Sequence, residues 1–455
     1  MTITTINPAT EETLAEYPEL SASQIEDVLR DTDAAFDEWR RVELGDRAEH
    51  LRALGAKLRE RETEYAELMT REMGKPLAQA VSEVQKCASV CDYYAENAAD
   101  FLADIEIESD ASRSFVTYQP LGVVLAIMPW NFPFWQVMRF AAPTLTAGNT
   151  GILKHAPNVT GCALALEELF SAAGYPDNVF RTLVVDVPAV DAVIRDPRIK
   201  AVTLTGSNRA GEAVASAAGA SIKKTVLELG GSDPAVILAD ADLAAAAAAC
   251  TTSRLLNAGQ SCIAAKRLIV VDEVRDEFEA RLVERMSQAV VGDPTDSNTT
   301  VGPLARADLR DNLHRQVSES VANGARVLLG GELPDPPGYF YPATLLADVG
   351  PGMPAYEEEL FGPVASIIPV SDETEALRVA NDTIYGLSAS VYTRDVERGQ
   401  QIAAELLDAG ACFVNSYPRS DPRLPFGGIK QSGYGRELSP FGIREFVNVK
   451  TVWVA

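Results

Sequence analysis

Cys262 stands in a segment whose residue types suggest chemistry. It occurs in "LLNAGQSCIAAK" (255–266), just after Gly-Gln-Ser, where an apolar helical pattern ends. Buried structural cysteines usually have apolar neighbours, whereas the neighbours of Cys262 are small or polar. The six cysteines of the chain also lack the spacing of a disulfide framework. We interpret Cys262 as a candidate nucleophile.

A thiol nucleophile needs a group that takes its proton, and the chain offers three histidines for this. His50 and His314 stand in charged helical stretches, so a Cys–His pair is possible only through His155, in "ILKHAP". So few histidines exclude a histidine-rich metal site. Cys87 and Cys91 have no second ligand pair beside them, so we expect no metal there. We favour a carboxylate as the proton acceptor.

Glu228 interrupts an apolar strand in "KTVLELGGSDPAV", directly before two glycines. Among valine and leucine side chains its carboxyl group would be buried, and burial raises a carboxyl pKa toward the range of a general base. The alternative is a strand with one face in water and Glu228 solvated. The two glycines favour a site, because they let another group approach the backbone closely.

Two prolines in "PWNFP" (129–133) fix the backbone on both sides of Asn131. A side-chain amide in such a stiff loop can donate to a developing oxyanion. Arg139 lies along the apolar helix that follows, about two turns after Asn131, and it is the only charge of that helix before Lys154. A lone arginine there can bind a carboxylate with two hydrogen bonds, or it can extend from the surface into solvent.

The segment "AVTLTGSNRAGEAVA" predicts a strand, a turn at Gly206 and Ser207, and then a helix. Backbone N–H groups at the start of a helix suit a pyrophosphate. The glycine spacing is not G-x-G-x-x-G, so this segment alone does not identify a dinucleotide site.

The elements that must position these side chains alternate in type. The first hundred residues have apolar residues at helical spacing. From 121 onward, strand-like segments alternate with helical ones at 134–148, 160–174, 188–197 and 209–220, and later at 275–290, 372–382 and 395–408. This alternation predicts parallel sheets covered on both faces by helices. The last segment, "EFVNVKTVWVA", predicts one final strand.

Composition narrows the class of protein. The 455 residues, 47% hydrophobic and 23% charged, are typical of a globular protein with two or three domains. A net charge of −25 argues against nucleic acid and anionic membranes as partners. We expect a cytoplasmic protein, because no signal peptide or membrane-spanning run is evident and the cysteines are scattered. The 65 acidic residues against ten lysines suggest a halophilic source, with an ordinary acidic enzyme as the alternative.

Five motifs, taken in order, resemble the aldehyde dehydrogenase superfamily. They are "PWNFP" (129–133), "LELGG" (227–231), "NAGQSC" (257–262), "EEELFGPV" (357–364) and "PFGGIKQSGYGRE" (425–437). The resemblance extends over essentially the whole chain. Within the family, "ILKHAPN", "NAGQSCIAAKR" and "GYGRELSPFGIREFVNVKTVW" are most similar to the succinate-semialdehyde dehydrogenase branch.

The resemblance implies roles for these residues. Cys262 would form a thiohemiacetal with the aldehyde, and the Asn131 amide and the Cys262 backbone N–H would hold the oxyanion. Hydride transfer to nicotinamide would leave a thioester, and Glu228 would activate the water that hydrolyses it to the acid. NAD or NADP would be bound at Trp130, Lys154, Gly206, Ser207, Glu359 and Phe361.

The resemblance also implies an architecture. The fold would be α/β, with a Rossmann-like cofactor domain (1–103 and 121–230), an α/β catalytic domain (231–437) and a β oligomerisation arm (104–120 and 438–455). Family members commonly assemble through this arm, so we expect a homodimer or homotetramer.

The substrate is expected to be a small aldehyde. Arg139 matches a position that binds the substrate carboxylate in the succinate-semialdehyde dehydrogenase branch. A second arginine of some members is replaced by Leu256, and Arg423, in "SYPRSDPRLPF", would substitute if its loop folds inward. Pro157 stands where NAD-preferring members often have a glutamate, so NAD and NADP both remain open.

Three other functions are alternatives to oxidation of succinate semialdehyde. One is a broad-specificity aliphatic aldehyde dehydrogenase, and another is an acylating enzyme that passes the thioester to coenzyme A. The presence of Glu228 argues against acyl transfer, which needs no water-activating base. The third is a non-catalytic relative, which the combination of Cys262, Glu228 and Asn131 disfavours.

Overall fold

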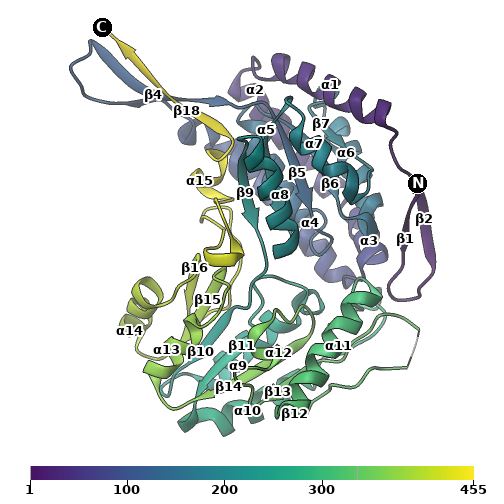
Figure 1. The fold of residues 1–455 in the computed structure, drawn as a ribbon, viewed down its shortest axis with the longest axis vertical. Helices are drawn as coiled ribbons and strands as arrows, with labels where there is room; N and C mark the ends of the chain where they lie inside the picture. Colours follow the sequence, from purple (N-terminus) through teal and green to yellow (C-terminus); the bar gives the residue numbers. More distant parts are fainter. Residues whose placement is uncertain (1, 336) are drawn as a thin grey trace.

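Figure 1 shows two sheets, each in its own half of the molecule, and an arm that extends away from them. The computed structural model describes residues 2–335 and 337–455. The first sheet has the order β17-β9-β8-β5-β6-β7, and only β17 is antiparallel to its neighbour. Its strands are β5 (Val123–Met128), β6 (Thr150–His155), β7 (Phe180–Thr182), β8 (Ile199–Thr205), β9 (Lys224–Glu228) and β17 (Gly433–Tyr434).

Helices cover both faces of this sheet, because alternate residues of each strand point to opposite sides. Val123 and Leu125 of β5 pack toward α1, α7 and α8, whereas Val124 and Ala126 pack toward α2 to α6. The helices are α1 (Ala22–Trp39), α2 (Leu44–Glu60), α3 (Glu62–Met73), α4 (Leu77–Phe101), α5 (Trp135–Thr146), α6 (Thr160–Ala172), α7 (Val187–Arg195) and α8 (Asn208–Ala220). Strands buried on both faces need the near-continuous apolar runs that the sequence contains.

The second sheet has the order β12-β13-β14-β11-β10-β15-β16, parallel except for β12. Its strands are β10 (Pro234–Ile237), β11 (Arg267–Val271), β12 (Arg326–Leu329), β13 (Thr344–Ala347), β14 (Val364–Val370), β15 (Ser388–Tyr392) and β16 (Ala411–Val414). The main helices around it are α9 (Leu243–Leu255), α10 (Asp272–Met286), α11 (Ala307–Ala322), α12 (Pro354–Glu357), α13 (Glu373–Asn381) and α14 (Val396–Gln401). A separate hydrophobic cluster fills this half.

The arm is a three-stranded antiparallel sheet with the order β18-β4-β3. It consists of β3 (Ile105–Glu106), β4 (Arg113–Pro120) and β18 (Val447–Val454), the last following the short helix α15 (Ser439–Ile443). In Figure 1, β4 and β18 lie side by side and project beyond the rest of the chain. The arm therefore joins two segments that are far apart in sequence.

The predicted α/β fold is confirmed, with local differences. Residues 2–18, expected to be helical with the rest of the first hundred residues, instead form an N-terminal hairpin of β1 (Thr2–Ile6) and β2 (Thr13–Pro18), whose strands are short and largely polar. The sequence analysis also missed β17, which lies in the segment assigned to the catalytic domain but pairs with β9 of the first sheet. The domain division itself stays a prediction. Among the described residues, no helix is long and apolar enough to cross a membrane.

Candidate active site

The backbone just before Cys262 has an unusual conformation. Asn257, Ala258 and Gly259 all have positive φ angles, of 55°, 52° and 73°. Non-glycine residues rarely adopt this left-handed conformation, and such strain is concentrated at functional sites. A Cβ atom on Gly259 would lie 2.2 Å from the carbonyl oxygen of Gly362, so the two backbones are in direct contact. This turn places Cys262 on the wall of a large cavity.

Two buried cations hold the turn from behind. The Arg254 guanidinium donates a hydrogen bond to the Gly259 carbonyl oxygen. Lys266 Nζ donates to the carbonyl oxygens of Ser261 at 2.8 Å and of Cys262 at 2.7 Å. The backbone that carries the nucleophile is thus held in place by the Arg254 and Lys266 side chains as well as by its own turn.

The surroundings of Cys262 favour the protonated form of its thiol. Its side chain is partly exposed, yet burial raises the pKa of the thiol to about 12, against the opposing effects of Lys266 and Arg139. A thiol with this pKa is a weak nucleophile until a base removes its proton. The resting structure therefore has to supply a base when substrate arrives.

Asn131 lies beside the nucleophile turn. Its amide Nδ2 donates to the Gln260 carbonyl oxygen at 3.0 Å, and its Oδ1 accepts from Gln136 Nε2 at 3.1 Å. The Asn257 amide donates to the Asn131 carbonyl oxygen at 2.7 Å, so the 129–133 loop and the nucleophile turn are held together. One Nδ2 hydrogen is used by Gln260, and an amide carries a second that can donate to an oxyanion.

His155 does not serve as the base for Cys262. Its Nδ1 accepts from the Ala156 backbone N–H at 2.9 Å, and its Nε2 lies 2.9 Å from the Pro133 carbonyl oxygen. Burial lowers the pKa of the imidazole to about 4, so the ring is neutral and Nε2–H donates to Pro133. The possible Cys–His pair is therefore excluded. His155 instead holds the end of the loop that carries Asn131.

Glu228 is buried at the end of β9, and neither carboxyl oxygen has a hydrogen-bond partner among the described residues. Burial raises the pKa of its carboxyl group well above the usual range, and the nearby Glu437 adds to the effect. The solvated alternative is thus excluded. A Cβ atom on Gly427 would lie 2.7 Å from Glu228 Oε1, so only glycine leaves room for this carboxyl group.

Arg139 lies on α5 and forms a buried ion pair with Glu437. Its guanidinium carbon is 4.4 Å from the centre of the Phe426 ring. The alternative of a solvent-exposed arginine is excluded, because Arg139 is only 3% exposed. Its charge already has a carboxylate partner in Glu437, and a substrate carboxylate would have to compete with that partner. Binding of a substrate carboxylate by Arg139 stays a prediction.

Arg423 points away from the site. It pairs with Asp421 at 2.6 Å and its side chain is 75% exposed, so the loop does not fold inward in the way its proposed role requires. Leu256, which replaces the second arginine of some family members, is also exposed. Neither residue supplies a cation to the interior.

A cavity of about 640 Å³ opens between the two halves of the molecule, in the size range of ligand sites. It lies at the carboxyl ends of β5, β8 and β9, where open α/β sheets bind ligands. Cys262 and Asn131 line it, and Glu228 and Arg139 do not. The six predicted cofactor residues all line it: Trp130, Lys154, Gly206, Ser207, Glu359 and Phe361.

The wall of the cavity carries one basic and one acidic side chain that can contact a ligand, Lys154 and Glu359. Lys154 is the buried cation on one wall, and burial lowers the pKa of its ammonium group while Asp186 opposes the shift. On the other side, Glu359 accepts from the Gly231 N–H at 3.1 Å and lies 3.3 Å from Lys266 Nζ. Ser207 caps α8 and its N–H-rich first turn faces the cavity with Gly206. A dinucleotide fits this set of groups.

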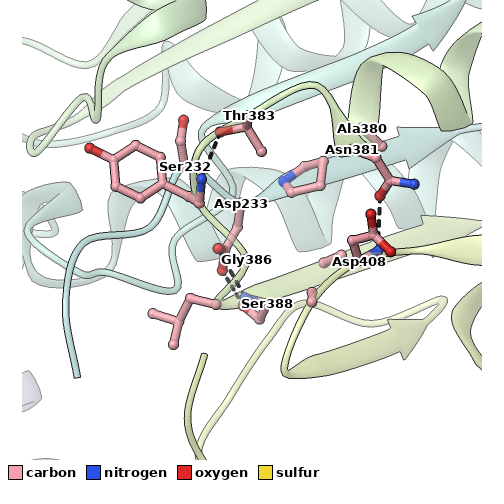
Figure 2. Close-up of a pocket in the computed structure, with 13 residues that line it drawn as sticks. Ser232, Asp233, Ala380, Asn381, Thr383, Gly386, Ser388 and Asp408 are labelled. Atoms are coloured by element: carbon pink, nitrogen blue, oxygen red, sulfur yellow. Dashed lines mark hydrogen bonds between the residues drawn. The ribbon is translucent and has the colours of Figure 1, made fainter. Parts of the chain in front are cut away.

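A second, much smaller cavity lies beside the starts of β10 and β15, and Figure 2 shows the residues around it. Asp233 accepts hydrogen bonds there from the Ser388 backbone N–H and hydroxyl group. Burial raises the pKa of Asp233 to about 7. The space is about 10 Å³, enough for one water at most, so this network supports the fold and does not bind a substrate.

Sequence reasoning missed several residues of the site. Glu437 lies within the 425–437 motif but had no predicted role, and no role was predicted for Arg254 or Lys266. A signal existed for Lys266, because it stands with Arg267 in a segment, "CIAAKRLIVV", that is otherwise apolar. No local signal linked Glu437 to Arg139, since the two are far apart in sequence.

Comparison with known proteins places this geometry in context. A model described as the aldehyde dehydrogenase family matches residues 1–452. The chain is 50% identical to a probable succinate-semialdehyde dehydrogenase [NADP(+)] of Synechocystis sp., over all of both chains. It is 49% identical to the succinate semialdehyde dehydrogenase Sad of Escherichia coli, over 98% of this chain and 97% of the other.

Solved structures agree with the sequence comparisons. A succinic semialdehyde dehydrogenase from Streptococcus pyogenes, solved with NADP+ as the cofactor, superposes with a TM-score of 0.97 at 40% identity, covering 99% of each chain. The structure of Gox0499, described in terms of cofactor and substrate selection, superposes with a TM-score of 0.98 at 39% identity over both full chains.

Proposed function

The chain belongs to the aldehyde dehydrogenase family, and on that premise we propose that it oxidises succinate semialdehyde to succinate with NAD or NADP as the hydride acceptor. The observation that carries the proposal is the meeting of Cys262 and Asn131 on one cavity wall. Similarity over the full length to dehydrogenases of this substrate supports the choice of aldehyde.

Six cavity residues would hold the cofactor. Gly206 and Ser207, at the start of α8, suit its pyrophosphate, and Lys154 suits the adenosine ribose. Trp130, Glu359 and Phe361 surround the end near Cys262, where nicotinamide would lie. The bound cofactor supplies a hydride acceptor. The absence of an acidic residue at Pro157 leaves both NAD and NADP acceptable.

Acylation of the enzyme would begin at Cys262. The thiol gives its proton to water in the cavity that Cys262 lines, its sulfur bonds to the aldehyde carbon, and the carbonyl oxygen becomes an oxyanion. The Asn131 amide and the Cys262 backbone N–H donate to that oxygen. The loop contacts of Asn131 with Gln260 and Asn257 keep the amide oriented, so little reorganisation is needed as charge develops. Loss of hydride from this adduct leaves a thioester on Cys262.

Hydrolysis would depend on Glu228. Its carboxyl group lies toward Glu437 and Arg139 in the resting structure, outside the cavity that Cys262 lines, so its side chain has to turn toward the thioester. There the carboxylate takes a proton from water as the water oxygen bonds to the acyl carbon. The carbon–sulfur bond breaks, succinate leaves, and the sulfur is again available.

Assembly through the arm is also part of the proposal. Val449 and Trp453 of β18 are 60% and 54% exposed although both are apolar. Among the strands that the structure describes, β18 pairs with β4 alone, which leaves its outer edge open. An open edge with apolar side chains favours association with a second copy. A cytoplasmic location agrees with this picture and stays a prediction.

The first prediction tests the proposed reaction directly. Wild type should reduce NAD or NADP with succinate semialdehyde, and Cys262→Ala should lower kcat/KM at least roughly 1,000-fold because no acyl-enzyme can form. Formation of reduced nicotinamide is followed by absorbance. Cys412→Ala, at a partly exposed cysteine in β16, is the matched control and should retain activity. Strict dependence on coenzyme A, or undiminished activity of Cys262→Ala, would contradict the proposal.

A further inference from the structure

A small cavity, distinct from the large one, adjoins the nucleophile segment. It has a volume of about 30 Å³ and is lined by Ile263, the residue after Cys262, and by Ser420, Leu424 and Phe426 of one loop. Cys262 itself lines the large cavity. Adjacent residues of the nucleophile segment thus border the space that suits a dinucleotide and a second space that the 418–426 loop lines.

Lys86 reaches the border of this small cavity from α4. Its Nζ donates a hydrogen bond to Ser420 Oγ at 2.6 Å. The ammonium group also lies 4.2 Å from the centre of the Trp135 ring, in a cation–π contact. The side chain is only partly exposed. Serine and tryptophan fix the position of the cation, but neither neutralises its charge.

The carboxylates near Lys86 already have other partners. Glu83 pairs with the buried Lys75, and Asp421 pairs with Arg423. In the part of the chain that the structure describes, no carboxylate oxygen lies within 4.0 Å of Lys86 Nζ. Burial and the nearby Arg139 lower the pKa of Lys86 to about 8, so the cation is present at neutral pH but lacks compensation. A bound anion would compensate the charge of Lys86.

The other cations around the cavity are less suited to receive an anion. Arg139 is bound to Glu437, and Arg423 is bound to Asp421 and points to solvent. Arg419 lines the cavity but is exposed, so water screens its charge. Lys86 alone in this group combines partial burial, a fixed position and the absence of a carboxylate partner.

We propose that Lys86, positioned by Ser420 and Trp135, binds the carboxylate of the aldehyde substrate and so selects an ω-carboxylated aldehyde. This inference rests on the proposed oxidation of succinate semialdehyde and names the residue that recognises its far end. The two carbonyl carbons of that substrate are separated by two methylene groups, or roughly 4 Å. Its carboxylate must therefore lie close to the nucleophile, where the small cavity begins at Ile263.

The test compares two aldehydes of equal chain length, succinate semialdehyde and butanal, in three variants. Lys86→Met replaces the cation by an unbranched neutral side chain and should lower the ratio of their kcat/KM values about 10- to 100-fold, mainly through KM for succinate semialdehyde. Lys86→Arg should restore most of the ratio. Arg419→Gln, the matched control on the loop, should change the ratio less than about 3-fold.

A binding measurement accompanies the kinetics and needs no turnover. Succinate should raise the melting temperature of the wild-type protein, and this increase should be lost in Lys86→Met and kept in Arg419→Gln. The melting temperatures without succinate show whether each variant is folded. A selective loss in Arg419→Gln, or equal losses for both aldehydes in Lys86→Met, would overturn the role of Lys86. A wild type without preference for succinate semialdehyde would instead overturn the proposed function itself.

Discussion

At the scale of single residues, the site holds its reactive groups in their neutral forms. The thiol of Cys262 and the carboxyl group of Glu228 both have raised pKa values, and burial is the first cause for each. Neutral groups tolerate a dry interior, whereas the charged forms would need compensation there. The reaction therefore requires both protons to move only when substrate is present. Lys266, which donates to the Cys262 carbonyl oxygen, lowers the pKa of the thiol and so favours the thiolate when it forms, although burial lowers the pKa of Lys266 itself.

Glu228→Gln separates the two halves of the reaction. The variant should still form one equivalent of reduced cofactor per site in a rapid burst, because acylation of Cys262 does not need the hydrolytic base. Steady-state turnover should fall about 100-fold or more, since water then attacks the thioester unassisted. Rapid-mixing absorbance measures both phases. Loss of the burst together with the turnover would show that Glu228 is needed for acylation as well.

The pH dependence has a definite sign in the same experiment. A general base must be deprotonated to act, and the pKa of Glu228 is raised well above its usual range. Turnover in wild type should therefore rise with pH through the raised pKa and be lost as the pH falls below it. The slow turnover of Glu228→Gln should lack this rise. A wild-type rate independent of pH from acid to neutral conditions would contradict a buried, protonated Glu228.

At the scale of elements, the position of the nucleophile depends on the strained turn before it. Gly259→Ala places a methyl group against the Gly362 carbonyl oxygen and disfavours the positive φ angle, so the turn must shift. We expect kcat/KM to fall more than about 10-fold and the melting temperature to drop by a few degrees. The control Gly219→Ala adds a methyl group in α8 where nothing lies within 4 Å, and it should be neutral or slightly stabilising. Similar activities of the two variants would show that the turn is not needed.

Sequence patterns predicted the elements well where the chain repeats a period, and poorly where distant segments meet. The strand–helix alternation from 121 onward gave α5 to α8 close to their bounds, because buried parallel strands must be apolar along their length. The β1–β2 hairpin was missed, since its polar strands carry little signal before they pair. Arg139 was identified, but its partner Glu437 was not, because their contact depends on the folded chain.

Within the candidate site, too, local sequence patterns predicted which residues belong to the site but not which distant residues they contact. Four of the predicted cofactor residues share one cavity because Trp130, Gly206 and Ser207 follow strands of the first sheet and Lys154 lies near the end of β6, and such ends meet at one edge. Glu359 and Phe361 reach the same cavity from the loop before β14. The local sequence does not indicate in which direction a side chain points. Glu228 and Arg139 turn toward Glu437, and Arg423 turns to solvent. Lys86 stood unremarked in a helix until the fold placed it against Ser420.

At the scale of the whole molecule, charge and exposed apolar surface act in opposite ways. The net charge of −25 repels copies of the chain from one another, and salt screens this repulsion. The halophilic source suggested by that charge stays a prediction. The arm, in contrast, exposes apolar side chains along β18, and burial of these side chains against a second copy would favour association.

The arm leads to the last prediction, which concerns assembly. Val449 and Trp453 are four residues apart on β18 and therefore on one face of the strand. The double variant Val449→Asp with Trp453→Asp should convert the dimer or tetramer that we expect into a smaller species, because it places charge where apolar side chains would be buried. Light scattering after size exclusion gives the mass. Ile222→Asp is the control, at an isolated apolar residue that is 96% exposed, and should leave the mass unchanged. A monomeric wild type, or a double variant of unchanged mass, would remove the arm as the interface.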